Sequence, residues 1–196
     1  MGQGPDAADQ NQLVVLVDEE DHQKGVLKKL EAHSSGGILH RAFSVFVFND
    51  KGETLLQKRA QQKYHSGGLW SNTCCSHPKP GEAVTDAAHR RLKEELGFDC
   101  ELVKAFDFIY KTPVGNGLTE YEYDHVYFGT YNGPVHPDSS EVESVEWIPV
   151  DELANKIVEN PSAYTEWLKM SFTRVLSLRE NWKNVDKRSQ RTSTLT

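Results

Sequence analysis

Residues 42–48 constrain the fold most, because this stretch would be apolar on both faces of a strand. Phe43, Val45 and Val47 would point to one face, and Phe46 and Phe48 to the other. A strand with one solvated face alternates apolar with polar residues, so we predict the central strand of a sheet. The next four residues end in a glycine, which can take a positive φ, and predict a hairpin turn before a second strand over 54–59.

The remaining pattern predicts an α+β fold around a mixed sheet. Apolar residues recur at three- and four-residue steps over 83–96, which is typical of a helix, and Gly97 suits its C-terminal end. We expect further strands over 13–17, 101–110, 120–131 and 143–148, and further helices over 26–33, 150–158 and 164–182. This order of elements along the chain, strands, a helix, strands and then helices, is typical of an α+β arrangement.

Length and composition suit a single domain. The chain has 196 residues, 37% of them hydrophobic, and shows no internal repeat and no linker. We expect one catalytic domain over 12–182, a flexible N-terminus over 1–11 and a flexible basic tail over 183–196.

Charge and cysteine content narrow the class of protein. The formal charge of −7 argues against a nucleic-acid partner, because an acidic surface repels phosphate backbones. No apolar run reaches the roughly eighteen residues of a membrane helix, and the N-terminus lacks the features of an export signal. Three cysteines, two of them adjacent, do not make a disulfide framework. We therefore expect a cytoplasmic protein without a membrane partner, as a monomer or a weak homodimer.

Chemically active side chains are concentrated between residues 72 and 97. Cys75 lies two residues before His77, and the predicted helix that follows carries Arg91 and Glu95 on one face. Taken alone, this Arg–Glu pair is a solvated ion pair on an amphipathic helix. A thiol, an imidazole and carboxylates at this density are costly to bury unpaired, which favours a functional site.

Acidic residues share one face of the predicted strand over 120–131. Alternate residues of a strand point to the same face, which places three of them together: Glu120, Glu122 and Asp124. Their repulsion requires a cation or shared protons, unless the strand is a solvated edge. Three histidines from separate segments favour the cation: His33, His40 and His77. A mixed imidazole and carboxylate set suits Mn²⁺, Zn²⁺ or Fe²⁺ better than Mg²⁺. The remaining histidines are interpreted as structural: His22, His65, His89, His125 and His136.

The segment around the predicted helix resembles the Nudix box, G-x5-E-x7-R-E-U-x-E-E-x-G-U, in which U is a bulky apolar residue. The matching positions are Glu82, Arg90, Glu94, Glu95, Gly97 and Phe98. Ser76 stands in place of the first glycine, and Arg91 in place of the glutamate after the arginine. The lost acid removes a hard oxygen ligand, so the resemblance implies the fold but not Nudix pyrophosphate hydrolysis.

Over about residues 13–180 the chain also resembles type I isopentenyl-diphosphate isomerases. The most specific match is W-S-N-T-C-C-S-H-P at 70–78, and other matches are K-x-x-x-H at Lys29–His33, His40-Arg41, Lys58-Arg59, Lys63, Glu120-Tyr121-Glu122 and Glu166-Trp167-Leu168. The resemblance implies a Nudix-like mixed sheet sandwiched by helices, with a core over about 38–172. It also implies interconversion of isopentenyl and dimethylallyl diphosphate through a tertiary carbocation.

The same resemblance implies roles for individual residues. Protons would be moved by Cys75 and Glu122 on opposite faces of the substrate, with help from Tyr110, in an order that the sequence leaves open. One Mn²⁺ or Zn²⁺ would be held by His33, His40, His77, Glu120 and Glu122, and a Mg²⁺ bound to the diphosphate by Glu95. The phosphate oxygens would be held by Lys29, Arg59, Lys63 and Arg91, and the cationic carbon would face Trp167.

Two other functions remain open at this point. A Nudix pyrophosphohydrolase would share the fold, although Arg91 and the spacing of Cys75 and His77 argue against it. A metal-binding or redox-sensing module without catalysis would use Cys74 and Cys75. By composition alone, Cys74 and Cys100 are interpreted as small buried hydrophobic residues.

Overall fold

The computed structural model describes the backbone of residues 12–193 and the side chains of residues 12–180. The predicted flexible N-terminus, 1–11, and the last three residues of the predicted tail lie outside the described residues. The elements are β1 (Leu13–Val17), β2 (Gln23–Lys28), α2 (Lys29–His33), β3 (His40–Phe48), β4 (Glu53–Arg59), β5 (Trp70–Ser71), β6 (Cys74–Ser76), α3 (Val84–Leu96), β7 (Leu102–Gly115), β8 (Leu118–Thr130), β9 (Val142–Pro149), α4 (Val150–Glu159), the 3₁₀ helix η1 (Pro161–Ala163) and α5 (Glu166–Ser193).

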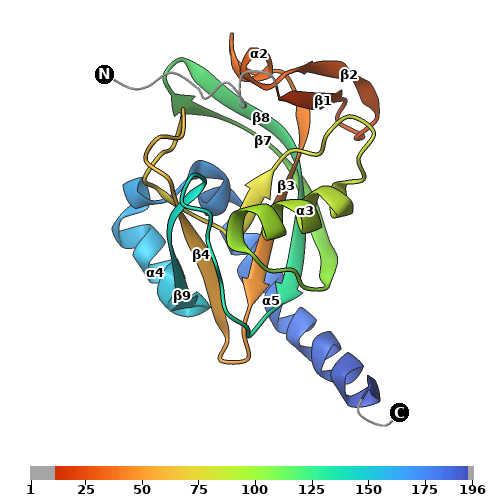
Figure 1. Cartoon of the computed structure of the whole chain (residues 1–196), viewed down its shortest axis with the longest axis vertical. Helices are drawn as coiled ribbons and strands as arrows, with labels where there is room; N and C mark the ends of the chain where they lie inside the picture. Colours follow the sequence, from red (N-terminus) through yellow and green to blue (C-terminus); the bar gives the residue numbers. More distant parts are fainter. Residues whose placement is uncertain (1–11, 194–196) are drawn as a thin grey trace.

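Strand β3 is the centre of a mixed sheet, as predicted. Strand β8 runs parallel to β3 along one edge from His40 to Phe48, and β1, β6 and β4 pair antiparallel with the other edge in turn. Strand β7 extends the sheet from β8, and β9 extends it from β4. Helix α3 covers one face of the sheet and α5 the other (Figure 1).

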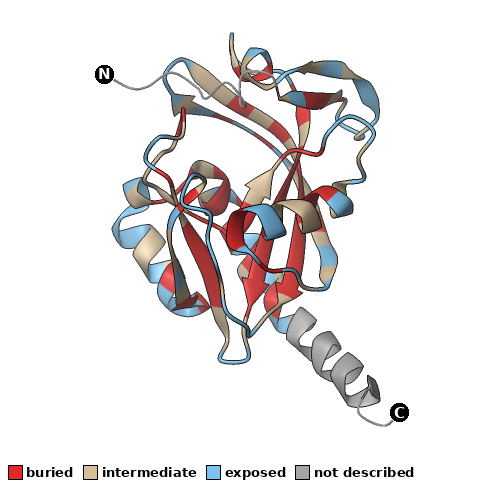
Figure 2. Cartoon of the chain, viewed as in Figure 1, coloured by how far each residue is buried: buried red, intermediate tan, exposed pale blue. Residues whose placement is uncertain are grey.

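The two apolar faces of β3 explain why a helix covers each face of the sheet. Phe43, Val45 and Val47 pack with α3 residues such as Leu92, while Phe46 and Phe48 pack with α5 residues such as Leu168 and Phe172. The buried residues follow the middle strands in Figure 2. The hairpin glycine, Gly52, has a φ of +82°, and Gly97 ends α3 with a φ of +71°, conformations that favour glycine in both turns.

Strands β3 and β4 pair only at Phe48 and Thr54 and are then bridged by residues 70–76. Within this segment β5 pairs with β4, and β6 pairs with β3. The fully buried Thr73 hydroxyl donates to the Leu55 carbonyl and accepts from the Val47 amide. The Asn72 amide likewise donates to the Val45 carbonyl. Buried side chains therefore replace ladder hydrogen bonds where the two strands separate.

Some predicted elements differ from the structure, and two short strands were not predicted. The helix predicted over 26–33 is wrong in its first half, because Val26 and Leu27 pair with Val15 and Val14 of β1 and only Lys29–His33 is helical. Strands β5 and β6 were not predicted, since two or three residues are too short to show a period. The helix predicted to end at 182 continues to residue 193.

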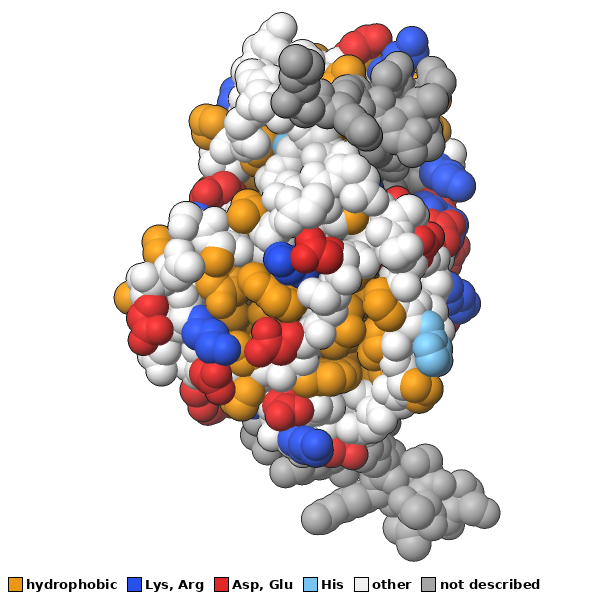
Figure 3. All heavy atoms as spheres, turned by 60° about the vertical axis from the view of Figure 1, so that its left-hand side comes forward, with side chains coloured by type: hydrophobic (Ala, Val, Ile, Leu, Met, Phe, Trp, Pro, Cys, Tyr) orange, Lys and Arg blue, Asp and Glu red, His pale blue; other side chains and the backbone are white. Residues whose placement is uncertain are grey.

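The side that carries α4 presents hydrophobic side chains among acidic and basic ones (Figure 3). Among the large hydrophobic side chains that the structure describes, Val158 of α4 is the most exposed, at 80%. None of the described helices is both long and apolar enough to cross a membrane.

Candidate active site

Strand register brings the predicted chemical groups to one face of the sheet. His40 pairs with Glu122 of β8 on one edge of β3, and Ser44, four residues further on, pairs with Cys75 of β6 on the other edge. Paired residues and residues an even number apart in a strand point to the same face. Glu122 and Cys75 therefore approach this face from opposite sides of β3.

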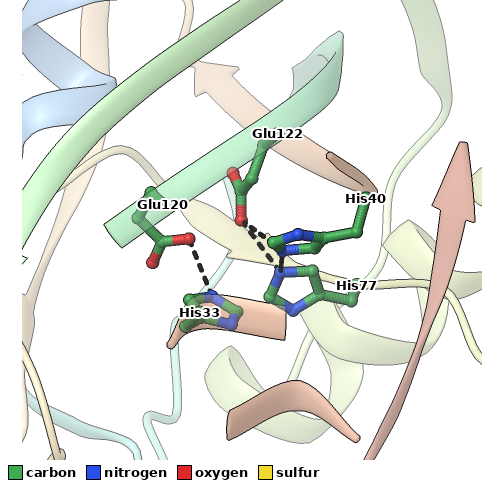
Figure 4. A group of neighbouring side chains, drawn as sticks. All are labelled: His33, His40, His77, Glu120 and Glu122. Atoms are coloured by element: carbon green, nitrogen blue, oxygen red, sulfur yellow. Dashed lines mark hydrogen bonds and ion pairs between the residues drawn. The ribbon is translucent and has the colours of Figure 1, made fainter. Parts of the chain in front are cut away.

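Five buried side chains converge at the end of this face: His33, His40, His77, Glu120 and Glu122. One nitrogen or oxygen from each lies within 4.8 Å of all the others. His77 Nε2 is 2.9 Å from Glu122 Oε1 and 3.1 Å from His40 Nε2, and His33 Nε2 is 2.8 Å from Glu120 Oε2 (Figure 4). Helix α2 contributes His33, so its short turn is what carries this imidazole to the sheet.

The tautomers of two of these histidines fit a bound cation. His33 Nδ1 lies 2.6 Å from the Lys29 carbonyl and His40 Nδ1 lies 2.7 Å from the Ile38 carbonyl. A carbonyl oxygen only accepts, so each Nδ1 carries the hydrogen and each neutral ring turns the Nε2 lone pair to the cluster. His33 Nε2 and Glu120 Oε2 are buried without a hydrogen bond, although they face each other. A divalent cation or a shared proton would satisfy these facing groups.

Buried carboxylates add to this requirement. Burial and the nearby Glu122 raise the pKa of Glu120. Asp124 lies on the same face, as predicted, and is 1% exposed, with Oδ2 2.8 Å from the Ser44 hydroxyl. Burial and Glu122 also raise its pKa well above the usual value. The acidic face is therefore buried rather than solvated, which excludes the interpretation of a solvated edge strand.

A cavity of about 280 Å³ opens beside the cluster. Of the residues predicted for the site it is lined by Cys75, Glu122, Tyr110, Lys29, Arg59, Lys63, Arg91, Glu95, Trp167, His77 and Glu120. His33 and His40 lie behind this lining as members of the cluster.

The thiol and the phenol of the cavity both hold their protons. Burial raises the pKa of Cys75 to about 12, against the lowering effect of Arg59, and the Ser71 hydroxyl lies 3.8 Å from the sulfur. The Tyr110 hydroxyl donates to Glu122 Oε2 at 2.5 Å, and burial followed by Glu122 raises the pKa of Tyr110. The Trp167 indole donates to Ser71 Oγ at 2.9 Å. Ser71 therefore connects the sulfur with the indole.

Basic residues also line the cavity, among them Lys29, Arg59, Lys63 and Arg91. The Arg59 guanidinium lies 5.2 Å from the centre of the Trp167 ring. Arg91 binds Glu95 Oε1 at 2.6 Å, and Gln57 donates to Glu95 Oε2 at 2.9 Å. Cations that converge in a chain of net negative charge are the arrangement expected of an anion site.

Among the lining residues that the sequence analysis did not assign to the site are His65, Glu141 and Lys79. His65 was interpreted as structural, yet its Nε2 is 3.2 Å from Glu120 Oε1. Glu141 Oε2 is 2.6 Å from Lys63 Nζ and 3.2 Å from Arg91 Nη2. All three lie in irregular segments, where no periodicity indicates which side chains meet.

Comparison with known proteins agrees with this geometry. The NUDIX domain model matches residues 38–168. The chain belongs to the NUDIX domain family. Isopentenyl-diphosphate Delta-isomerase 2 of Aromatoleum aromaticum is 50% identical over 166 residues, which cover 85% of this chain and 87% of that protein. The isopentenyl-diphosphate Delta-isomerase of Pectobacterium atrosepticum is 49% identical over 83% of this chain and 90% of that protein. Within the NUDIX domain family, the chain thus groups with the isopentenyl-diphosphate Delta-isomerases.

Solved structures show the same NUDIX fold at lower sequence identity. DR0079 from Deinococcus radiodurans superposes with a TM-score of 0.69 at 18% identity, covering 83% of this chain and 98% of that one. The MutT protein from Methanosarcina mazei Go1 gives a TM-score of 0.60 at 18% identity, covering 73% of this chain and 95% of that one. The predicted α+β, Nudix-like fold is confirmed.

Proposed function

We propose that this NUDIX family member interconverts isopentenyl diphosphate and dimethylallyl diphosphate. Its relatives are named isopentenyl-diphosphate Delta-isomerases. The observation that carries the proposal is the placement of two proton-handling groups. Cys75 and Glu122 line one cavity and reach it from opposite edges of β3. Moving a double bond requires protonation of one carbon and deprotonation of another, which needs such a pair.

The proton inventory of the cavity supports this chemistry. The Cys75 thiol keeps its proton at neutral pH, because burial raises its pKa to about 12. Tyr110 donates to one oxygen of Glu122, while the imidazoles of His40 and His77 lie beside the other. One of these two residues, Glu122 or Cys75, then gives a proton to one carbon. The other takes a proton from a second carbon on the opposite side. In a reversible reaction the two residues exchange roles with direction.

The carbocation between these two steps must be kept from water and stabilised. Trp167 is 4% exposed and presents its ring to the cavity. A desolvated contact of a cation with an indole ring is worth about 2 kcal/mol. The ring is held in place by its hydrogen bond to Ser71.

The acidic and basic residues at the cavity would bind the metals and the diphosphate. His33, His40, His77, Glu120 and Glu122 would hold one Mn²⁺ or Zn²⁺, whose charge offsets that of the buried carboxylates and fixes the orientation of Glu122. Glu95 would contribute to a Mg²⁺ site with the diphosphate oxygens, because each of its hydrogen-bonded oxygens keeps a second lone pair. The phosphate oxygens would be bound by Lys29, Arg59, Lys63 and Arg91.

We further place the reaction in the cytoplasm, with a small homoallylic or allylic diphosphate as the partner and a monomer or weak homodimer as the working unit. The described cysteines are free, which suits a reducing compartment.

Incubation with isopentenyl diphosphate in D₂O tests the proposed reaction. We expect deuterium in the dimethylallyl product, read by mass spectrometry, and no release of phosphate. Cys75→Ala should lower turnover by about 10²- to 10⁴-fold, since it removes one acid–base group. Cys100→Ala is the matched control, because Cys100 does not line the cavity.

Two results would contradict the proposal. Release of inorganic phosphate or pyrophosphate without deuterium incorporation would favour a Nudix hydrolase. Turnover of Cys75→Ala equal to that of Cys100→Ala would remove Cys75 from the acid–base pair.

A further inference from the structure

His65 contacts the metal-type cluster without belonging to it. Its Nε2 is 3.2 Å from Oε1 of Glu120, while the other oxygen of this carboxylate, Oε2, is 2.8 Å from His33 Nε2. His65 is 5% exposed and Glu120 is 3% exposed. The Glu120 carboxylate therefore lies between two imidazoles, one inside the cluster of five and one outside it.

The two nitrogens of His65 face groups that select one tautomer. An ionised carboxylate only accepts, so beside ionised Glu120 the hydrogen of the neutral His65 ring belongs on Nε2, 3.2 Å from Glu120 Oε1. Nδ1 lies 3.2 Å from the Ser66 hydroxyl, which can donate to it. This arrangement is the reverse of His33, whose Nδ1 donates to a backbone carbonyl. His65 is thus built to donate to Glu120, whereas His33 presents a lone pair.

The loop around His65 holds the ring in place. The His65 carbonyl accepts from Arg59 Nη2 at 3.4 Å, and the preceding carbonyl, of Tyr64, accepts from Asn116 Nδ2 at 2.9 Å. The chain then turns tightly through Gly67, where a Cβ atom would stand 2.6 Å from the Gln61 carbonyl oxygen. A loop tied at this many points can fix the direction of a side chain.

We propose that His65 is a positioning residue that holds the Glu120 carboxylate in the orientation in which Oε2 faces His33 and the cluster. This inference rests on the metal site of the proposed function. Partners that bind metal-ligating carboxylates contribute about 10- to 100-fold to metal affinity. The two neighbouring acids therefore have different partners. Glu120 contacts His33 and His65, whereas Glu122 contacts His40, His77 and Tyr110.

The competing role for His65 is packing in the cavity wall. Its ring meets the Trp167 ring edge-on, with 6.1 Å between centroids. Two substitutions separate the roles. His65→Gln keeps a donor near the position of Nε2 but removes the ring, and His65→Phe keeps a ring but removes the donor.

Metal affinity of the intact protein, measured by competition with a chromophoric Zn²⁺ chelator, tests the proposal without reference to turnover. We expect His65→Phe to weaken Zn²⁺ binding about 10- to 100-fold, and His65→Gln to stay within about threefold of the unmodified protein. The absorption spectrum of bound Co²⁺ should change in His65→Phe only. His89→Phe is the matched control, because His89 also contacts a carboxylate, Asp99 at 2.6 Å, but lies outside the cavity.

Other results would overturn the inference. Equal Zn²⁺ affinity of His65→Phe and His89→Phe, or weak binding by His65→Gln with normal binding by His65→Phe, would leave His65 as a wall residue only. An unmodified protein that binds no Zn²⁺, Mn²⁺ or Co²⁺ would overturn the metal site itself and this inference with it. Thermal unfolding of each variant verifies that it is folded.

Discussion

Glu120 and Glu122 are two residues apart on one face of β8, yet their surroundings differ. Glu120 lies beside His33 and His65, and Glu122 beside His40 and His77. Glu122 also accepts a hydrogen bond from Tyr110. Adjacent carboxylates in different environments are the usual way in which a site assigns different tasks to the same chemical group. In our proposal Glu120 only binds the cation, while Glu122 also moves a proton.

Substitution of Tyr110 tests the role of this phenol. Tyr110→Phe removes a hydrogen bond to a charged group, worth about 1.5–3 kcal/mol, so we expect kcat to fall about 10- to 100-fold. Zn²⁺ affinity should also fall, by about 10- to 100-fold, because Tyr110 holds the carboxylate of the proposed ligand Glu122, so kcat is compared at saturating Zn²⁺. Tyr123→Phe, on the opposite face of β8, is the control. Unchanged kcat in Tyr110→Phe would contradict the assignment.

Single residues show what the sequence could and could not reveal. The candidates His33, His40 and His77 could be selected because a specific family motif contains them. His65 could not, because its contact with Glu120 joins a loop to a strand 55 positions away in the chain, and nothing in the local sequence reports that distance.

At the scale of elements, long periodic segments were predictable and short ones were not. Strand β3 and helix α3 follow directly from their apolar periods. Residues 26–28, predicted as the start of a helix, belong to strand β2, because pairing with β1 outweighs a local pattern of three apolar residues. Strands β5 and β6 exist only because buried Asn72 and Thr73 bridge the gap between β3 and β4. The motif W-S-N-T-C-C-S-H-P thus has structural residues between its chemical ones.

Helix α3 contains Arg91, which replaces a glutamate of the Nudix box. Substitution of Arg91 tests what this arginine does. Arg91 is held by Glu94, Glu95 and Glu141 at the mouth of the cavity. Arg91→Lys keeps the charge but loses the planar fork that binds two phosphate oxygens. We expect KM for isopentenyl diphosphate to rise about tenfold, the loss of one charge-assisted hydrogen bond, with a smaller change in kcat.

The control for this helix substitution is Arg174→Lys on α5, which contacts the Asp107 carbonyl away from the cavity. Competition by inorganic pyrophosphate should weaken in Arg91→Lys and not in the control. An unchanged KM together with a lowered kcat would instead assign Arg91 to the chemical step.

At the scale of the whole molecule, the cluster joins segments that lie far apart in the chain. Strand β1 pairs with β3 at a single position, Leu16 with His40. Helix α2 brings His33 against Glu120 of β8, and the segment after β6 brings His77 against Glu122. A bound cation would therefore link the N-terminal hairpin of β1 and β2 to the sheet, so metal binding and global stability should be coupled.

Removal of the metal should consequently lower the melting temperature. A ligand at about 1,000 times its Kd stabilises the folded state by about 4 kcal/mol, and about 1 kcal/mol shifts Tm by about 2–4 °C in a protein of this size. We expect EDTA to lower Tm on the order of 10 °C in calorimetry, and Zn²⁺ or Mn²⁺ to restore it. His77→Ala, whose metal content should fall in elemental analysis, should melt at the same temperature with and without EDTA. An unmodified protein indifferent to EDTA, or a His77→Ala protein that keeps its metal, would show that these five side chains are held together by hydrogen bonds alone.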